Sequence, residues 1–275
     1  MDEGRDDFMG FASRRQTFAP DLTAFDPATL APPALAAARF VWARRVTNES
    51  ASIEVSKRLL ATATTLGLAP SVLAALKRLE SDEALHARLA RAMLERLGEL
   101  HFLPAEVLPP LPQESAEASF ARQVVCALCI GESVSASRYA AVREATDLAV
   151  PRACIELFLR DEVLHGQVGF SLLPGAIERL AAAMGANDAR AFVERALSTT
   201  LHHLEATIGM DAERRGMPVA RSQPADNPGV VEPTIDALAF YDAVTRTILP
   251  SFEACGVAAA RLWTDRWRSH GQRAP

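Results

Sequence analysis

One five-residue pattern, Asp-Glu-x-Leu-His, occurs twice in this chain, at residues 82–86 and 161–165. In each copy Glu and His stand three positions apart, within a stretch of helix-favouring residues. Side chains three positions apart leave one face of an α-helix about one turn from each other. Each copy therefore presents one carboxylate and one imidazole side by side.

A further glutamate precedes each copy at a similar distance. Glu49 lies 34 residues before Glu83 (83 − 49), and Glu132 lies 30 residues before Glu162 (162 − 132). Both upstream glutamates begin a Glu-Ser-x-Ser sequence. If the chain turns back midway, two antiparallel helices bring each glutamate level with its Glu-x-x-His. Glu54 is an alternative to Glu49, which we prefer because its sequence context matches that of Glu132.

Four carboxylates and two imidazoles are the donors that two iron or manganese ions need. Burying so many acids without cations costs on the order of several kcal/mol for each charge. The pattern therefore predicts either a two-metal centre or two solvated helix faces. Glu and His three apart are common on surface helices, but a matched duplicate favours the metal centre. The candidate ligands are Glu49, Glu83, His86, Glu132, Glu162 and His165.

Helical patterns separated by short turns predict an all-α chain. The Pro-rich segment 98–114 cannot be a helix, and it is long enough to cross from one end of a helix bundle to the other. Two hairpins joined by one long crossover match the connectivity of a ferritin-like four-helix bundle. The expected bundle helices cover residues 33–66, 71–97, 115–145 and 151–170, the last ending before Pro174.

Further helices are expected beyond the bundle, at residues 188–208, 234–249 and 252–267. The predicted organisation has three parts. They are an N-terminal arm (1–30), a ferritin-like di-metal bundle (31–180) and a C-terminal helical extension packed on the bundle (181–275).

Composition narrows the classes of partner and compartment. The formal net charge of −5 gives no general attraction to nucleic acid or to an anionic membrane. No apolar stretch approaches the length of a membrane span, and the first residues lack the order of a secretory signal. Four cysteines in 275 residues do not make a disulfide framework. We expect a cytoplasmic protein that binds neither nucleic acid nor membrane.

The six-residue pattern resembles that of the ferritin-like di-iron carboxylate superfamily, whose helices contribute Glu, Glu-x-x-His, Glu and Glu-x-x-His. The likeness covers residues 36–172, and the Asp-Glu-x-x-His form looks most like N-oxygenases, desaturases and hydroxylases. It implies that Asp82 and Asp161 accept hydrogen bonds from the ligand imidazoles and orient them. It also implies two iron ions, or manganese with iron, with some carboxylates bridging. One ion would bind Glu49, Glu83 and His86, and the other Glu132, Glu162 and His165.

The same resemblance implies an activity. It is that of a di-iron enzyme that uses O2 to hydroxylate, desaturate or N-oxygenate a small organic substrate, with electrons from an external reductase. The alternatives are an iron-oxidising or peroxide-scavenging protein and an iron-binding protein, both without an organic substrate. A homodimer is compatible with each of these interpretations.

Several residues outside the six leave open questions. The sequence does not decide whether His202 or His203 adds a ligand. Phe158 stands where some arylamine N-oxygenases carry a seventh ligand. The chain holds two tyrosines, Tyr139 and Tyr241, which argues against a radical relay.

Small residues accompany both motifs. They either leave room for a substrate beside the metals or allow close helix packing. These residues are Ala87, Ala90, Gly166 and Gly169.

Overall fold

Proline and glycine set the ends of the first long helices. The structure, a computed structural model, describes residues 10–11, 20–98, 113–207 and 227–266. Proline occupies the first turn of α2 (Pro32–Thr65) and of α3 (Pro70–Arg96), where a missing N–H removes no helical hydrogen bond. Gly67 and Gly98 follow these helices with positive φ angles of 61° and 75°. Glycine adopts this helix-ending conformation without strain.

Every regular element of the described residues is helical, so the predicted all-α class is confirmed. Ser115 caps the next rod by accepting a hydrogen bond from the Ala118 N–H at 3.2 Å, as the sequence predicts. The elements beside α2 and α3 are η1 (Leu22–Ala24), η2 (Pro27–Thr29), α4 (Ala116–Gln123), the π-helix η3 (Val124–Glu132), α5 (Ser133–Ala145), α6 (Ala149–Met184), α7 (Ala186–Thr207), α9 (Pro233–Ala243), the π-helix η5 (Val244–Ile248), α10 (Leu249–Ala254) and α11 (Ala259–Asp265).

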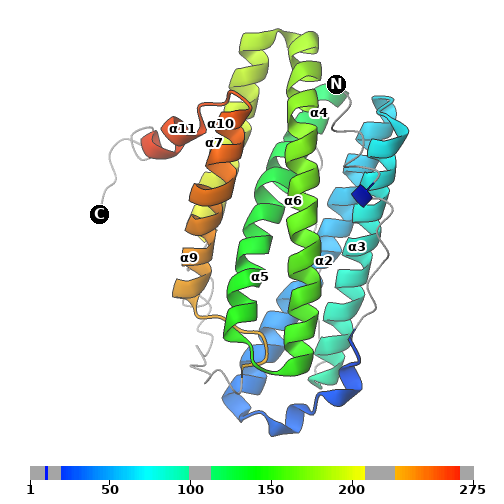
Figure 1. The fold of residues 1–275 in the computed structure, drawn as a ribbon, viewed down its shortest axis with the longest axis vertical. Coiled ribbons are helices and arrows are strands. Elements are labelled where there is room, and N and C mark those ends of the chain that lie inside the picture. The colour runs from blue at the N-terminus through cyan, green and yellow to red at the C-terminus, as the bar shows by residue number, and fades with distance from the viewer. Residues whose placement is uncertain (1–9, 12–19, 99–112, 208–226, 267–275) are drawn as a thin grey trace.

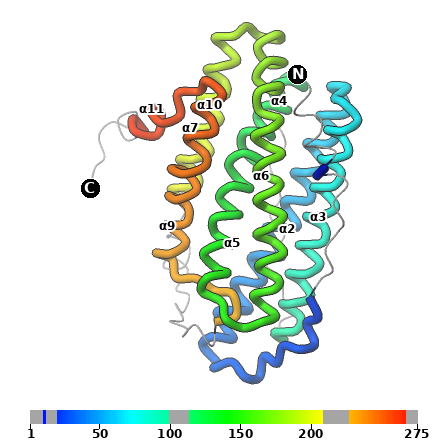
Figure 2. The backbone as a smooth tube through the Cα atoms, in the orientation of Figure 1, coloured from blue at the N-terminus to red at the C-terminus, as the bar shows by residue number. Residues whose placement is uncertain are grey.

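Four helical rods run side by side along the long axis: α2, α3, the continuous α4–η3–α5 rod, and α6 (Figures 1 and 2). α2 pairs with α3 and α5 pairs with α6, and the two pairs meet where α3 contacts α6 and α2 contacts α4. α3 ends at one end of the molecule, whereas α4 begins at the other. The α3 helix and the α4–η3–α5 rod therefore run in the same direction. The expected crossover, 98–114, falls mostly outside the described residues.

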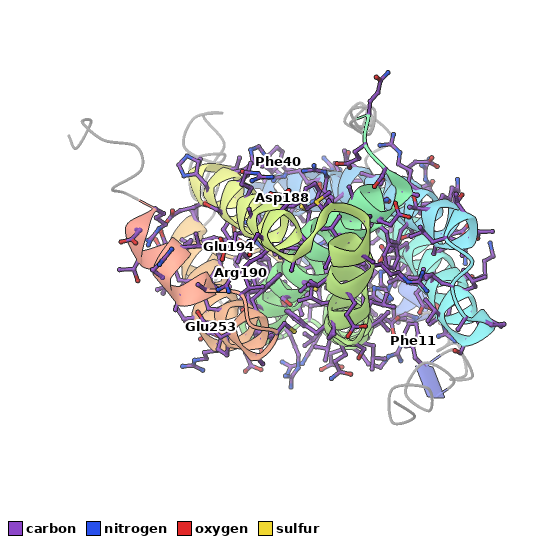
Figure 3. All side chains as sticks on the ribbon, turned by 90° about the horizontal axis from the view of Figure 1, so that it is seen from above. Phe11, Phe40, Asp188, Arg190, Glu194 and Glu253 are labelled. Atoms are coloured by element: carbon purple, nitrogen blue, oxygen red, sulfur yellow. The ribbon has the colours of Figure 1, made fainter. Side chains whose placement is uncertain are left out.

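The later helices cover one flank of these rods. α7 packs on α6 and η3, α9 packs on α5, and α11 contacts α7. Figure 3 looks along the long axis and shows Arg190 and Glu194 of α7 on the side of the molecule away from α3, near which Phe11 lies. Within the described ranges, no helix combines the length and apolar character needed to cross a membrane.

The α6 helix is longer than the sequence predicts. Its expected end lies near Phe170, but the helix continues through Pro174 to Met184. A proline in a helix interior costs about 3 kcal/mol. The turns beyond it bury Ala176 and Leu180 almost completely, and burial of that face stabilises the helix past the proline.

The C-terminal helices also divide differently from the prediction. One rod runs without a break from Pro233 to Ala254, across the expected boundary between 234–249 and 252–267. The break comes later, at Gly256, whose φ is 78°, and the short α11 follows it.

A polar layer divides the interior into two apolar clusters. Along α2, Trp42 comes before Glu49 and Leu59 comes after it. Trp42 packs in one cluster with Phe158, and Leu59 packs in the other with Leu128. Each rod passes from one apolar cluster to the other, and the residues between the clusters form the layer that holds the candidate ligands.

Candidate metal centre

All four rods deliver acidic or histidine side chains to this layer. Glu83 and Glu162 belong to two overlapping groups, in each of which the potential donor atoms all lie within 4.8 Å of one another. We name the groups after the glutamates that they do not share. The Glu49 position consists of Glu49, Glu83, His86 and Glu162, and the Glu132 position consists of Glu83, Glu132, Glu162 and His165. The structure thus brings together the six residues that the sequence singles out.

The layer is largely closed to water. Glu132 is the candidate that is only partly buried. Neither carboxylate oxygen of Glu83 has a hydrogen-bond partner within the described residues. A buried carboxylate in this state is unfavourable unless a cation neutralises it. The other five candidates each expose 4% or less of their surface: Glu49, Glu83, His86, Glu162 and His165.

Both imidazoles turn the same ring nitrogen toward the carboxylates. Nδ1 of His165 lies 3.0 Å from Oε2 of Glu162 and 3.1 Å from Oε1 of Glu83. Nδ1 of His86 lies 3.5 Å from Oε2 of Glu49. It also lies 3.8 Å from one oxygen each of Glu83 and Glu162. Nδ1 is therefore the nitrogen that could bind a metal at both positions.

The outer ring nitrogens contact aspartates in a crossed arrangement. Nε2 of His86 lies 3.2 Å from Oδ2 of Asp161. Nε2 of His165 lies 3.6 Å from Oδ2 of Asp82. Each aspartate thus contacts the histidine of the other motif copy rather than its own. The His86–Asp161 pair lies at hydrogen-bond distance, a contact of the kind that orients a ligand imidazole and increases its basicity. The His165–Asp82 pair is too far apart for a hydrogen bond, and Nε2 of His165 has no hydrogen-bond partner among the described residues.

Arginines hold the two aspartates in turn. Nε of Arg78 donates to both carboxylate oxygens of Asp82, at 2.8 and 2.9 Å. Nε and Nη2 of Arg160 donate to Oδ1 of Asp161, at 2.9 and 2.7 Å. Burial alone would raise the pKa of Asp161, but hydrogen bonds from His86 and Arg160 outweigh it and lower that pKa. Asp161 is therefore kept as a charged acceptor.

Without a cation, the layer retains protons. Burial raises the pKa of Glu49 to about 7 and raises that of Glu132 well above its usual range, and neighbouring carboxylate charges add to both shifts. Burial alone would lower the pKa values of His86 and His165, but the surrounding carboxylates raise both well above the ordinary value. Burial also opposes ionisation of Glu83, yet the neighbouring imidazoles of His165 and His86 lower its pKa to about 2. A metal that binds here must displace protons.

The structure bears on two questions that the sequence leaves open: whether Glu49 or Glu54 joins the other candidate ligands, and whether His202 or His203 adds a ligand. Glu54 is exposed and pairs with Lys57 at 2.6 Å, whereas Glu49 lies in the layer. His203 is exposed on α7, and His202 lines a small groove between α7 and α11. Among the described residues, neither histidine belongs to the Glu49 position or the Glu132 position.

Sequence reasoning missed a side chain that contacts a candidate ligand. The Tyr139 hydroxyl donates to Oε1 of Glu49 at 2.5 Å. The Tyr139 ring packs on Phe158 with centroids 5.3 Å apart, and Phe158 packs edge-on against His86 at 4.9 Å. Tyr139 lies seven residues after Glu132 (139 − 132), two helical turns along one face. That spacing was the available signal.

One glycine beside the second motif serves close packing. A Cβ atom on Gly169 would lie 2.6 Å from Cβ of Leu128, so α6 and η3 approach almost backbone to backbone there. A Cβ atom on Gly166 would meet Oγ of Ser133 at 3.5 Å, an ordinary contact distance. The π-helix η3 ends at Glu132, and π-helical turns are frequent at functional sites.

Two divalent cations fit this set of side chains. Each position offers carboxylate oxygens and one Nδ1 atom, a donor set that suits iron or manganese better than thiophilic metals. Glu83 would neutralise a cation at either position, which accounts for its lack of other partners. The layer could therefore hold metal ions.

No protein-family model matches the chain, and no curated protein or solved structure matches it. The case for a metal centre therefore rests on the side chains themselves.

Proposed function

We propose that this chain is a ferritin-like protein whose two-iron centre uses O2 to hydroxylate, desaturate or N-oxygenate a small organic molecule. The observation that carries the proposal is the pair of donor groups that share Glu83 and Glu162. Two carboxylates common to both positions would hold two cations close together, as two-metal enzymes require.

The path of the chain supports the ferritin-like assignment. α2 pairs with α3 and α5 pairs with α6, and α3 runs in the same direction as the α4–η3–α5 rod. A bundle of two hairpins with one long crossover has this arrangement. Each hairpin also carries its candidate ligands in the order Glu, then Glu-x-x-His, as in di-iron carboxylate proteins.

The chain's own residues would hold and orient the metals. Nδ1 of each histidine and the four carboxylates are the proposed donors, with Glu83 and Glu162 shared. Asp161 and Asp82 would fix the orientation of the imidazoles through Nε2. When bound, two iron ions supply the oxidising chemistry with O2, using electrons from an external donor.

Aromatic side chains would keep water from the imidazoles. Phe158 lies against His86 at 4.9 Å, and Phe11 lies edge-on against His165 with ring centroids 6.1 Å apart. Glu132 is the partly exposed candidate ligand. We therefore propose that O2 and substrate approach from the side of the Glu132 position.

Metal analysis of the full-length protein after anaerobic loading with Fe²⁺ tests this function. We expect two iron ions per chain and a transient visible absorption when O2 is admitted. Glu54→Gln, which removes an exposed carboxylate of the same helix as Glu49, should leave both results unchanged. A chain that binds no iron, or holds iron that does not react with O2, refutes the proposal.

A second measurement separates the proposed enzyme from its iron-oxidising alternative. With a reductant present, O2 uptake should continue when the correct organic substrate is supplied from a screen. O2 uptake during which no compound of the screen is consumed would support the alternative.

A further inference from the structure

The two positions differ around the glutamates that they do not share. Oε1 of Glu49 accepts the hydrogen bond of Tyr139 at 2.5 Å, while its Oε2 lies 3.5 Å from Nδ1 of His86. One oxygen of this carboxylate is therefore engaged by a neutral donor, and the other faces the layer. A hydrogen-bonded carboxylate oxygen is a poorer metal donor, because the hydroxyl draws on the same lone pairs.

A buried cation also lies beside the Glu49 position. Arg45 precedes Glu49 by one helical turn and exposes 7% of its surface. Its guanidinium carbon lies 4.5 Å from the Trp42 ring centroid and 5.9 Å from that of Tyr139. Its Nη2 donates to the Gly229 carbonyl at 2.7 Å, which is a neutral partner. The Arg45 guanidinium also interacts electrostatically with the Glu49 carboxylate, and its positive charge opposes a second cation nearby.

The surroundings of Glu132 are different. The charges that act most strongly on this carboxylate belong to Glu162, Glu83 and His165, which are themselves candidate ligands. Glu162 and Glu83 act on Glu49 in the same way, so the two positions differ in Arg45 and Tyr139, which lie beside Glu49.

We infer that the two positions bind metal with unequal affinity: the Glu132 position fills first, and Arg45 with Tyr139 makes the Glu49 position the weaker one. This inference rests on the proposed two-metal function. Tyr139 and Arg45 act here as positioning residues, since they act through Glu49 rather than on a metal. The Glu49 position is then the one from which a metal is lost first.

Titration of the metal-free full-length protein with Mn²⁺ under anaerobic conditions tests the inference. Calorimetry gives the two affinities, and electron paramagnetic resonance distinguishes a single bound Mn²⁺ from a coupled pair. We expect two steps at least about tenfold apart, the difference that one hydrogen bond to a charged group makes. Glu49→Gln should remove the weak step only, and Glu132→Gln should remove the tight step.

Tyr139→Phe removes the hydroxyl and keeps the ring that packs on Phe158. We expect the weak step to become about tenfold tighter and the tight step to stay unchanged. A merely structural role would loosen both steps. Tyr241→Phe, at the other tyrosine of the chain, is the matched control and should change neither. Arg45→Gln should also tighten the weak step. If Arg45→Gln does not fold, the result for Tyr139→Phe alone tests the inference.

The outcomes separate this inference from the proposed function. A native chain that binds no Mn²⁺ and no Fe²⁺ would end both. Two ions bound with equal affinity would overturn the inference alone. Loss of the tight step in Glu49→Gln, or a weaker second step in Tyr139→Phe, would overturn it as well.

Discussion

The two halves of the candidate centre carry almost the same motif in different surroundings. Trp42, Tyr139 and Phe158 pack around the Glu49 position, together with the cation of Arg45. The Glu132 position is bordered by a π-helix and by the tight approach of α6 to η3, and its glutamate is partly exposed. A duplicated motif therefore gives similar donors, whereas the neighbouring helices give each donor set its own electrostatic environment.

The largest effect on metal binding is expected for a residue that both halves share. Glu83 belongs to both positions, so Glu83→Gln should abolish binding of both metal ions, while Glu49→Gln should abolish one. Removing a carboxylate charge that belongs to both positions would leave each with less negative charge to offset desolvation of a cation. Metal content after loading and desalting measures the difference. A Glu83→Gln protein that retains two ions would show that Glu83 is not shared.

The crossed aspartates give the next largest effect and distinguish the halves directly. Asp161→Asn should weaken metal binding at the Glu49 position, because Asp161 contacts His86. Asp82→Asn should weaken the Glu132 position through His165. Loss of such a contact costs about 10-fold to 100-fold in metal affinity. In a titration with Mn²⁺, Asp161→Asn should weaken the binding step of the Glu49 position and Asp82→Asn that of the Glu132 position. If each variant instead weakened the other step, the crossed geometry would be contradicted.

The packing around Glu132 predicts an effect on stability. Gly169→Ala should lower the free energy of unfolding by about 1–3 kcal/mol, the usual cost of overpacking, because its methyl group would collide with Leu128. Gly175→Ala on the same helix meets nothing within 4 Å and should raise that free energy by up to about 1 kcal/mol. Urea denaturation of the metal-free proteins compares the two. Equal values for both variants would mean that α6 and η3 do not touch at Gly169.

The last effect concerns the pH dependence of metal affinity, and it applies to both halves. The raised pKa values of Glu49, Glu132 and the two imidazoles mean that the metal-free layer holds protons near neutral pH. Metal binding needs the deprotonated forms, so affinity should fall as pH decreases from about 8 to 6, by about tenfold per unit for each proton released. Calorimetry in buffers of different ionisation enthalpy counts those protons. Affinity that is constant over this range would contradict the assigned protonation.

Much of the helical framework and all six candidate donors could be predicted from the sequence. Glu-x-x-His has the period of a helix, and its duplication with upstream glutamates restricts how two hairpins can meet. The end of α6 could not be predicted, because local rules stop a helix near Pro174 while burial of Leu180 depends on the tertiary structure. Two-metal binding and the oxygenase activity stay predictions that the experiments above test.

The sequence does not predict contacts that depend on the orientation of each helix about its own axis. Tyr139 and Glu49 are 90 residues apart and meet on different hairpins. The sequence placed Asp82 and Asp161 beside imidazoles, but it did not show that each contacts the histidine of the opposite copy. The π-helix before Glu132 could not be predicted either. Residues 124–130 are uniformly apolar, and such a sequence does not distinguish a π-helix from an α-helix.

The crossed contacts between Asp82, Asp161 and the two histidines couple the hairpins mechanically. Each imidazole is attached to one helix and steadied from the other, so sliding or twisting of α3 against α6 would tilt both rings together. An event that shifts either hairpin would thereby reach both positions at the same time.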